Sequence, residues 1–242
     1  MKAIILSAGR GSRLLPLTET RPKCLLRVGD TTVLGYQLQR LAEGGVTEAL
    51  VVTGFLPALV EEEAARHDGT MKVRTLYNPF FQIADNLASC WMARSHMDDD
   101  FLLINGDTLF EAALLGDVLA NPGDLPIQVT TDRKASYDSD DMKVQLNGTR
   151  LVAIGKTLPN DRADAESIGL LRFTGAGPAM YREKLEQMMR TQDGVSQWFL
   201  KAIDAIASTT GQVGTFSIEG RRWNEIDTVA DYEGIHPRFR QE

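Results

Sequence analysis

Residues 1–25 read MKAIILSAGRGSRLLPLTETRPKCL, and they indicate how the fold begins. The apolar run at residues 3–6 is typical of a buried parallel strand. Residues 7–13, SAGRGSR, then predict a turn directly after that strand. Because Gly9 and Gly11 have no Cβ atom, the backbone can turn sharply there and bring its N–H groups close to an anion. We therefore expect a strand that leads into a phosphate-binding loop.

The glycine spacing excludes two common phosphate motifs. No Gly-Lys-Ser/Thr follows the loop, as a P-loop requires, and Gly9-x-Gly11 lacks the third glycine of a dinucleotide fingerprint. Instead, residues 9–18 (GRGSRLLPLT), followed by Pro22-Lys23, resemble the signature of the sugar-phosphate nucleotidyltransferase superfamily. Cys24 is the one visible departure, since many members have a second proline at this place.

The resemblance implies a role for each part of this loop. In the superfamily the loop wraps the triphosphate of a nucleotide. The residue at the place of Arg13 faces the departing pyrophosphate, and the one at the place of Lys23 contacts the phosphates around the reacting centre. The residues that we expect to hold the nucleotide are Ser7, Ala8, Gly9, Gly11, Ser12, Asn86 and Ser89.

Composition limits the class of protein. The 242 residues are 43% hydrophobic, which supports a substantial core, and the net charge of −7 argues against a general nucleic-acid or membrane-surface binder. Cys24 and Cys90 form neither a disulfide framework nor a metal-ligand pattern, which fits a reducing cytoplasm. Neither an export signal nor a run of eighteen apolar residues is apparent, so we expect a cytoplasmic protein. A homo-oligomer is compatible with this composition.

Apolar periodicity predicts an α/β fold. Strands are expected at residues 3–6, 49–53, 71–76, 101–104, 126–131, 142–146, 151–154, 169–173 and 212–218. Helices are expected at residues 33–43, 57–67, 87–94, 177–190, 196–206 and 229–235. Strands that alternate with helices imply βαβ crossovers, and therefore a Rossmann-like, mostly parallel sheet flanked by helices.

The second half of the chain has a different pattern. Asn147-Gly148, between two expected strands, is a strong hairpin signal and indicates a β-rich segment after the parallel core. We expect a single domain over residues 1–242, with a nucleotide-binding core at 1–125 and a small β-rich acceptor lobe at about 126–175. Residues 176–242 would supply helices and the closing metal-ligand segment.

A metal site is expected at the end of the strand at residues 101–104. Asp107 follows this strand, at the edge of the sheet where ligands bind in open α/β folds. In the superfamily an aspartate at this place holds Mg²⁺, and a second one comes from a late segment that resembles residues 223–228, which makes Asp227 its partner. Carboxylates are the hard oxygen ligands that Mg²⁺ prefers. Glu225 is either an auxiliary ligand or a nearby surface residue.

Residues 77–94 carry the information about the acceptor. Asp85 or Asn86 can cap the helix that follows, and Ser89 lies one turn into it, where side chains face a ligand at the helix N-terminus. An N-cap beside aromatic core residues is the alternative interpretation. Taken together, Asn78-Pro79 and Asp85-Asn86-x-x-Ser89 resemble the branch that includes bacterial phosphocholine and 2-aminoethylphosphonate cytidylyltransferases. That branch uses CTP.

The β-rich segment supplies further candidates for the acceptor site. The substrate-binding residues that we expect are Asp85, Lys143, Lys156, Glu166 and Trp223. Lys143 and Lys156 lie on neighbouring hairpin strands, where both could reach one acceptor phosphate, although exposed lysines often serve solubility alone. An acceptor ammonium could be bound by the acidic loop Asp138, Asp140 and Asp141 or by an aromatic cage from Trp91, Tyr137 and Trp223. The sequence leaves both open.

The predicted activity is Mg²⁺-dependent transfer of a cytidylyl group from CTP to a small phosphorylated or phosphonate acceptor, with release of pyrophosphate. Arg13, Lys23, Asp107 and Asp227 would carry the chemistry, by neutralising charge and holding the reactants in line. One alternative is a sugar-1-phosphate or polyol-phosphate nucleotidyltransferase. A second is a catalytically inactive, nucleotide-binding regulatory subunit. A dehydrogenase is disfavoured, because no acidic ribose partner follows a strand at the expected place.

Overall fold

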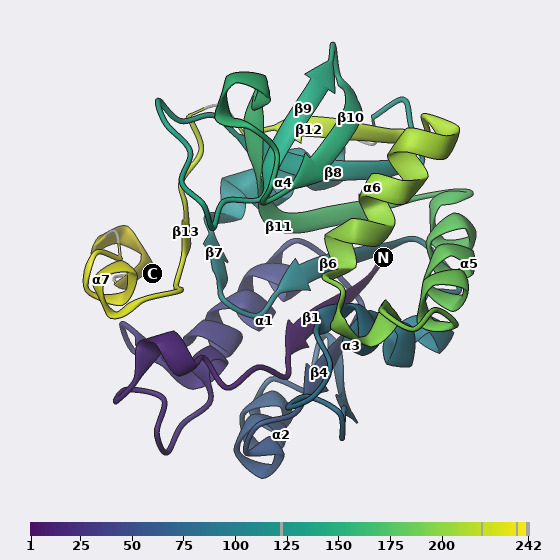
Figure 1. Ribbon diagram of the computed structural model, residues 1–242. Helices are drawn as coiled ribbons and strands as arrows, with labels where there is room; N and C mark the ends of the chain where they lie inside the picture. Colours follow the sequence, from purple (N-terminus) through teal and green to yellow (C-terminus); the bar gives the residue numbers. More distant parts are fainter. Residues whose placement is uncertain (122, 219, 236, 241–242) are drawn as a thin grey trace.

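A nine-stranded sheet runs through the computed structural model, which describes residues 1–121, 123–218, 220–235 and 237–240 (Figure 1). The strand order is β5-β4-β1-β6-β11-β8-β12-β10-β9. These strands are β1 (Lys2–Ser7), β4 (Glu48–Thr53), β5 (Lys72–Tyr77), β6 (Phe101–Asn105), β8 (Ile127–Asp132), β9 (Lys143–Asn147), β10 (Arg150–Gly155), β11 (Ala165–Phe173) and β12 (Val213–Ser217). Two small pairs lie outside the sheet, β2 (Arg27–Val28) with β3 (Thr31–Thr32) and β7 (Thr108–Phe110) with β13 (Trp223–Glu225).

The sheet is mixed, although its first half is parallel as predicted. Strands β5, β4, β1 and β6 are all parallel, but β11 lies antiparallel between β6 and β8. The chain reaches β11 from the β9–β10 hairpin without a crossover helix, and a parallel neighbour would need such a helix. Residues 126–175 therefore contribute strands to the same sheet as the first half.

Helices cover both faces of the sheet (Figure 1). One face packs against α1 (Val33–Glu43), α2 (Pro57–Arg66) and α4 (Ala112–Ala120), and the other against α3 (Asn86–Met92), α5 (Gly177–Met189) and α6 (Phe199–Thr210). The side chains of β1 alternate between the two faces. Ala3 and Ile5 lie in the core beneath α1, α2 and α4, and Ile4 lies in the core beneath α3, α5 and α6. Helix α4 was not expected from the sequence, because Gly116 and Asp117 interrupt a short apolar run that lacks a clear helical period.

The strand order fixes where a ligand can enter. From β1 the chain passes through α1 to β4 on one side, whereas β6 pairs with β1 on the other side. The order of strands therefore reverses between β1 and β6. In open α/β sheets the crevice at the carboxyl ends of the two strands at such a point is the usual binding site.

A small third core holds the late segment of the chain against the early loops. It contains Leu14, Leu26 and Tyr36 from the first forty residues together with Ile226 and Ile235. The short helix α7 (Val229–Glu233) belongs to this late segment. Figure 1 shows α7 beside the purple N-terminal loops. This packing brings residues that are about two hundred positions apart to the same edge of the sheet.

Candidate active site

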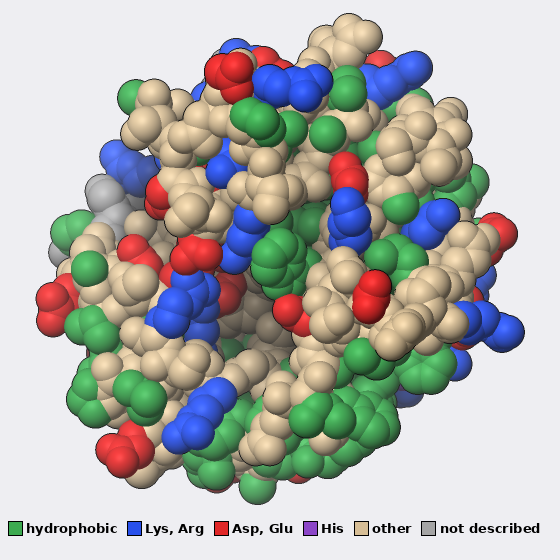
Figure 2. Space-filling model, viewed as in Figure 1, with side chains coloured by type: hydrophobic (Ala, Val, Ile, Leu, Met, Phe, Trp, Pro, Cys, Tyr) green, Lys and Arg blue, Asp and Glu red, His purple; other side chains and the backbone are tan. Residues whose placement is uncertain are grey.

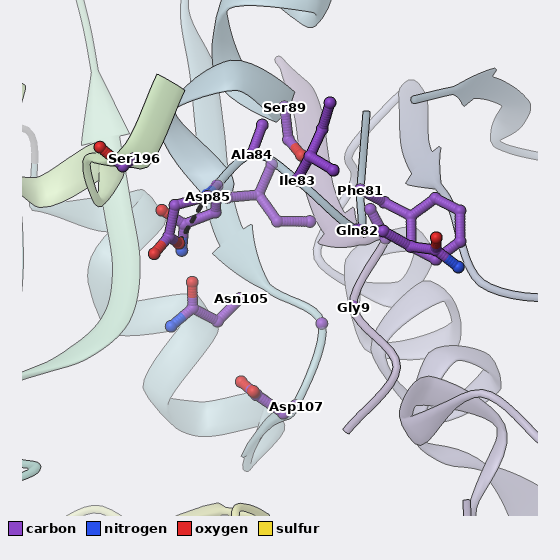
Figure 3. A pocket seen from close by; sticks show the side chains of 14 residues that line it. Gly9, Phe81, Gln82, Ile83, Ala84, Asp85, Ser89, Asn105, Asp107 and Ser196 are labelled. Carbon is purple, nitrogen blue, oxygen red and sulfur yellow. Dashed lines mark hydrogen bonds between the residues drawn. The ribbon is translucent and has the colours of Figure 1, made fainter. Parts of the chain in front are cut away.

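A cavity of about 540 Å³ opens at the carboxyl ends of β1 and β6. Its lining residues are Leu6, Ala8, Gly9, Phe81, Gln82, Ile83, Ala84, Asp85, Asn86, Ser89, Asn105, Gly106, Asp107 and Ser196. In Figure 3, Asn105 and Asp107 project into this space on one side, and the segment from Phe81 to Ser89 forms another wall. The cavity lies where the reversal of strand order predicts a ligand.

The loops at this edge approach each other so closely that they require glycine. A Cβ atom on Gly106 would lie 2.5 Å from the carbonyl oxygen of Leu6 and 2.6 Å from Ser7 Oγ. Gly11 adopts a φ of +72°, in the left-handed region, and its Cβ would lie 2.9 Å from Lys23 Cβ. By contrast, a Cβ on Gly9 would meet nothing within 4 Å. Gly9 therefore keeps its backbone open toward the cavity.

The start of α3 forms the far wall of this cavity. Asp85 caps the helix by accepting a hydrogen bond from the Asn86 backbone N–H, and Asn86 Oδ1 accepts one from the Phe199 backbone N–H at 2.7 Å. The buried Ser89 Oγ accepts a hydrogen bond from Asn78 Nδ2 at 3.0 Å. These bonds fix the helix end and leave its polar side chains at the cavity wall.

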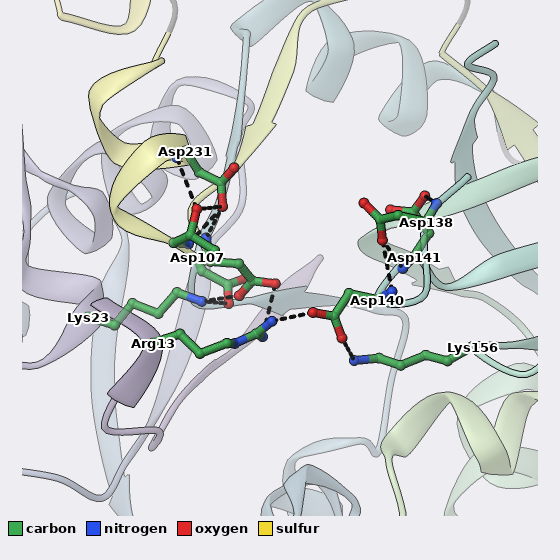
Figure 4. A network of polar contacts seen from close by, with 10 residues as sticks. Arg13, Lys23, Asp107, Asp138, Asp140, Asp141, Lys156 and Asp231 are labelled. Carbon is green, nitrogen blue, oxygen red and sulfur yellow. Dashed lines mark hydrogen bonds and ion pairs between the residues drawn. The ribbon is translucent and has the colours of Figure 1, made fainter. Parts of the chain in front are cut away.

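Lys23 lies between two carboxylates at the edge of the cavity (Figure 4). Its Nζ donates to Asp107 Oδ2 and to Asp227 Oδ1, each at 2.6 Å. Burial lowers the pKa of Lys23, but the two carboxylates outweigh that effect and raise it above its usual value. Arg13 adds a second cation, with NH2 3.1 Å from Asp227 Oδ2. The four residues expected to carry the chemistry therefore lie in one connected group.

The position of Asp227 depends on the pairing of β7 with β13. This antiparallel pair places Glu225 opposite Thr108, next to Asp107, and the Ile226 backbone N–H donates to the Asp107 carbonyl oxygen at 3.2 Å. The Ile226 side chain is fully buried, and the capping box of α7 begins directly after Asp227. The fold thus supports Asp227 from both sides.

The carboxylates around Lys23 have the composition of a magnesium site. Asp107, Glu225 and Asp227 each offer one oxygen, and these three oxygens lie within 4.8 Å of one another. Asp107 Oδ1 is buried and has no hydrogen-bond partner, so it is available to a ligand. Burial, together with the charges of Asp107 and Asp227, raises the pKa of Glu225 to about 8. Because hard carboxylate oxygens suit Mg²⁺, these residues fit that ion.

A second cavity, of about 450 Å³, lies on the other side of this group. Its lining residues are Arg13, Asp132, Lys134, Asp138, Asp140, Asp141, Glu166, Trp223, Asn224, Glu225, Asp227, Thr228 and Asp231. Figure 2 shows a hollow near the middle of the face in view, with acidic and basic side chains around it. The first cavity includes Asp107 and the second includes Asp227, so Lys23 bonds to one carboxylate from each.

An ammonium group already occupies part of the second cavity. Lys134 Nζ lies 2.8 Å from Asp141 and 3.0 Å from Glu166. Burial raises the pKa of Glu166 to about 7, and Asp141 adds to this rise, while Lys134 opposes it. Trp223 Nε1 donates to Asp132 Oδ2 at 2.7 Å and forms another part of the wall. The cavity is therefore strongly acidic, and its carboxylates are arranged to hold a cation.

The two hairpin lysines lie behind the acidic loop and do not line the second cavity. Lys143 is buried and donates to the Asp138 carbonyl oxygen at 3.0 Å, and Lys156 pairs with Asp140 at 3.0 Å. Both lysines therefore bind the acidic loop. The sequence instead suggested that they reach an acceptor phosphate directly. Glu166 and Trp223 line the cavity, whereas Asp85 lines the first one.

Two of the three aromatic candidates lie elsewhere. Trp91 packs against the core of α3, α5 and α6, with Arg94 over its ring at 3.9 Å. Tyr137 lines a separate hollow on the outer side of its loop. Among the described residues that line the second cavity, Trp223 is the only aromatic one. An aromatic cage from these three residues is therefore not present.

The remaining residues of the N-terminal loop have different surroundings. Ala8 and Gly9 line the first cavity, but Ser7 is buried behind it against Gly106, and Ser12 begins a short 3-10 turn. The lining residues of the second cavity that were missed from the sequence include Asp132, Lys134 and Asp231. Asp132 ends a strand, which is a signal that could have identified it, while Lys134 has the pattern of any exposed loop lysine.

A glycine-containing loop and a pair of carboxylates lie at the switch point of the α/β sheet, with a cavity on each side, which is the arrangement that the sequence predicts for a nucleotidyltransferase. The chain belongs to the nucleotidyl transferase family, whose model matches residues 2–122, half of the sequence. Solved structures share the fold. The CTP:phosphocholine cytidylyltransferase from Streptococcus pneumoniae has a TM-score of 0.81 at 20% identity, over 97% of this chain and 96% of that one. The inositol-1-phosphate CTP transferase from T. maritima has a TM-score of 0.82 at 21% identity, over 99% and 93%. The predicted fold class is confirmed.

Curated relatives include enzymes named for cytidylyl transfer. CMP-5'-(3-aminopropyl)phosphonate synthase of Streptomyces rubellomurinus is 29% identical over 99% of this chain, but the chain spans only 39% of the length of that relative. CTP:phosphoglutamine cytidylyltransferase of Campylobacter jejuni is 22% identical over 96% of this chain and 98% of the relative. Among the described residues, no helix combines the length and the apolarity needed to cross a membrane.

Proposed function

We propose that this protein transfers a cytidylyl group from CTP to a small phosphonate or phosphate acceptor that bears a primary amine. The observation that carries the proposal is the position of Lys23, which bonds to Asp107 of the first cavity and to Asp227 of the second. The α-phosphate of a nucleotide in the first cavity and an acceptor oxygen in the second would meet beside this lysine. An oxygen of the acceptor then attacks the α-phosphorus, and pyrophosphate leaves.

Charge neutralisation and positioning supply the catalysis in this proposal. Both reactants are anions and repel each other, and the acceptor phosphate or phosphonate oxygen is already ionised near neutral pH, so no general base is required. Lys23 stabilises the negative charge at the reacting phosphate, and Arg13 stabilises the departing pyrophosphate. The Gly9 backbone lets the triphosphate approach closely, because no side chain lies in the way.

Asp107 and Asp227 would hold the Mg²⁺ ion, with Glu225 as a third oxygen donor. When bound, the ion would supply further positive charge to the phosphates of the nucleotide. The unpartnered, buried Asp107 Oδ1 supports this assignment, because a buried carboxylate oxygen without a partner is costly. We propose the remaining nucleotide contacts at Asn86 and Ser89, which lie at the wall of the first cavity.

The acidic second cavity favours an acceptor with a primary ammonium. Asp141 and Glu166 bind the Lys134 ammonium at hydrogen-bond distance, and a substrate ammonium has the same donors. A quaternary ammonium has no N–H to donate and is usually recognised by several aromatic faces. Because Trp223 is the only aromatic residue among the described lining residues, a choline group is the poorer fit. The relatives named for aminopropylphosphonate and for phosphoglutamine agree with a cytidylyl transfer of this kind.

A sugar-1-phosphate or polyol-phosphate acceptor is the second candidate, favoured by the fold shared with an inositol-1-phosphate CTP transferase. Pyrophosphate release separates the two. With Mg²⁺, each of the four nucleoside triphosphates is combined with 2-aminoethylphosphonate, phosphocholine, inositol phosphate and hexose-1-phosphates. We expect the highest kcat/KM for CTP with 2-aminoethylphosphonate. Turnover confined to a sugar phosphate would refute the proposed acceptor class. Nucleotide binding without turnover on any acceptor would favour an inactive regulatory subunit.

A further inference from the structure

Asp140 makes an ion pair with a residue of the proposed catalytic group. It lies on the loop of residues 133–142 between β8 and β9, and its two oxygens contact cations from different parts of the chain. Arg13 NH1 lies 2.6 Å from Asp140 Oδ2, and Lys156 Nζ lies 3.0 Å from Asp140 Oδ1 (Figure 4). The carboxylate thus connects the phosphate-binding loop to the β9–β10 hairpin.

This contact extends a row of charges of alternating sign. In order, the row contains Lys156, Asp140, Arg13, Asp227, Lys23 and Asp107, and every neighbouring pair lies within 3.1 Å. Lys156 is also held from its other side, since its Nζ lies 4.8 Å from the centre of the Trp198 ring. The link between Arg13 and Asp140 is the most exposed pair in the row, with half or more of each side chain accessible. It is therefore the link that an incoming ligand can replace most readily.

Each partner of this pair faces a different substrate. The following inference rests on the proposed function, in which Arg13 binds nucleotide phosphates and the acceptor ammonium enters the second cavity, which Asp140 also lines. A phosphate competes with Asp140 for Arg13, and an ammonium competes with Arg13 for Asp140. The two substrates must therefore break the same ion pair, and the first to bind removes this cost for the second. By linkage, each substrate then raises the affinity of the other by the same factor.

We infer that the Arg13–Asp140 ion pair is a gating contact that makes nucleotide and acceptor binding cooperative. Asp140 is a positioning residue in this account, because it acts on the nucleotide through Arg13. Exposed ion pairs have small free energies, so the expected cooperativity is about two- to fivefold in affinity.

The test compares the wild-type protein with Asp140→Asn, Asp140→Glu and a control, Asp161→Asn. Asp161 is exposed on the neighbouring turn at Asn160–Arg162 and lies outside the row of ion pairs, so its substitution removes the same charge without touching Arg13. Calorimetry measures the affinity for α,β-methylene-CTP with Mg²⁺ under three conditions. These are no acceptor, 2-aminoethylphosphonate, and ethylphosphonate, which lacks the amine. The amine-free probe separates the role of the ammonium from that of the phosphonate.

For the wild-type protein we expect 2-aminoethylphosphonate, but not ethylphosphonate, to tighten nucleotide binding about two- to fivefold. Asp140→Asn should bind the nucleotide alone about two- to fivefold more tightly and lose the response to the amine. Asp140→Glu should restore the response, and Asp161→Asn should match the wild type. Equal nucleotide affinities in wild type and Asp140→Asn would overturn the inference, whatever the acceptor proves to be. An absence of nucleotide binding by the wild type would overturn the proposed function and the inference together.

Discussion

The cavity at the ends of β1 and β6 is lined mostly by backbone and by uncharged side chains, whereas the second cavity is lined by eight carboxylates and two cations. The first depends on glycines that cannot be changed without moving strands, such as Gly106 against Leu6. The second depends on side chains of loops and strand ends, which can change while the sheet stays the same. This difference suggests that one cavity is tied to the fold and that the other is free to vary.

The group that joins the cavities should show the largest effect. Asp107→Ala or Asp227→Ala should lower kcat by at least about 1000-fold, since each removes a carboxylate that binds Lys23 and the proposed metal. Circular dichroism and Tm check that the fold is retained. Asp117→Ala, on the distant helix α4, serves as a control for loss of a paired carboxylate. Normal turnover in either variant would separate that carboxylate from the chemistry.

The two glycines of the loop test how far the first cavity is tied to the fold. Gly11→Ala forces an L residue into φ +72° and against Lys23, which should cost about 1–2 kcal/mol, or roughly 2–8 °C in Tm. Gly9→Ala should change stability by less than about 0.5 kcal/mol. Because its new methyl group enters the cavity, it should still weaken CTP binding by about tenfold. The comparison fails if Gly9→Ala alters the Tm and leaves the nucleotide affinity unchanged.

The smallest effect concerns Glu166 in the second cavity. Its pKa is raised to about 7, from 4.5, so the folded state keeps a proton that the unfolded state has lost. Stability should therefore decrease as the pH rises from about 4.5 to 7 and then level off. Glu166→Gln should lack this decrease, so its Tm relative to wild type should rise over that interval. Thermal unfolding between pH 5 and 8 measures this difference in Tm, with a substitution of the exposed Glu62, Glu62→Gln, as control. A constant difference in Tm would mean that Glu166 is ionised throughout.

The same contrast explains what could be predicted from the sequence. The loop at residues 7–13 and the aspartate after β6 carry local signals, because strand ends and glycines have a fixed meaning in α/β sheets. The insertion of β11 between β6 and β8 has no such signal, since pairing partners are chosen by the whole sheet. Nor does a contact between Arg13 and Asp140 follow from periodicity, because it joins loops 127 positions apart.

The pairing of β7 with β13 has a consequence for the newly made protein. Lys23 and Asp227 are separated by 204 positions, so synthesis at about 5–20 residues per second leaves the lysine without this partner for roughly 10–40 s. During that interval the nascent chain already contains the strands β1, β4 and β6, but it lacks Asp227 and, for most of the time, Ser196 of the first cavity. Under the proposed function, the growing polypeptide therefore lacks its complete carboxylate pair until residue 227 has been synthesised.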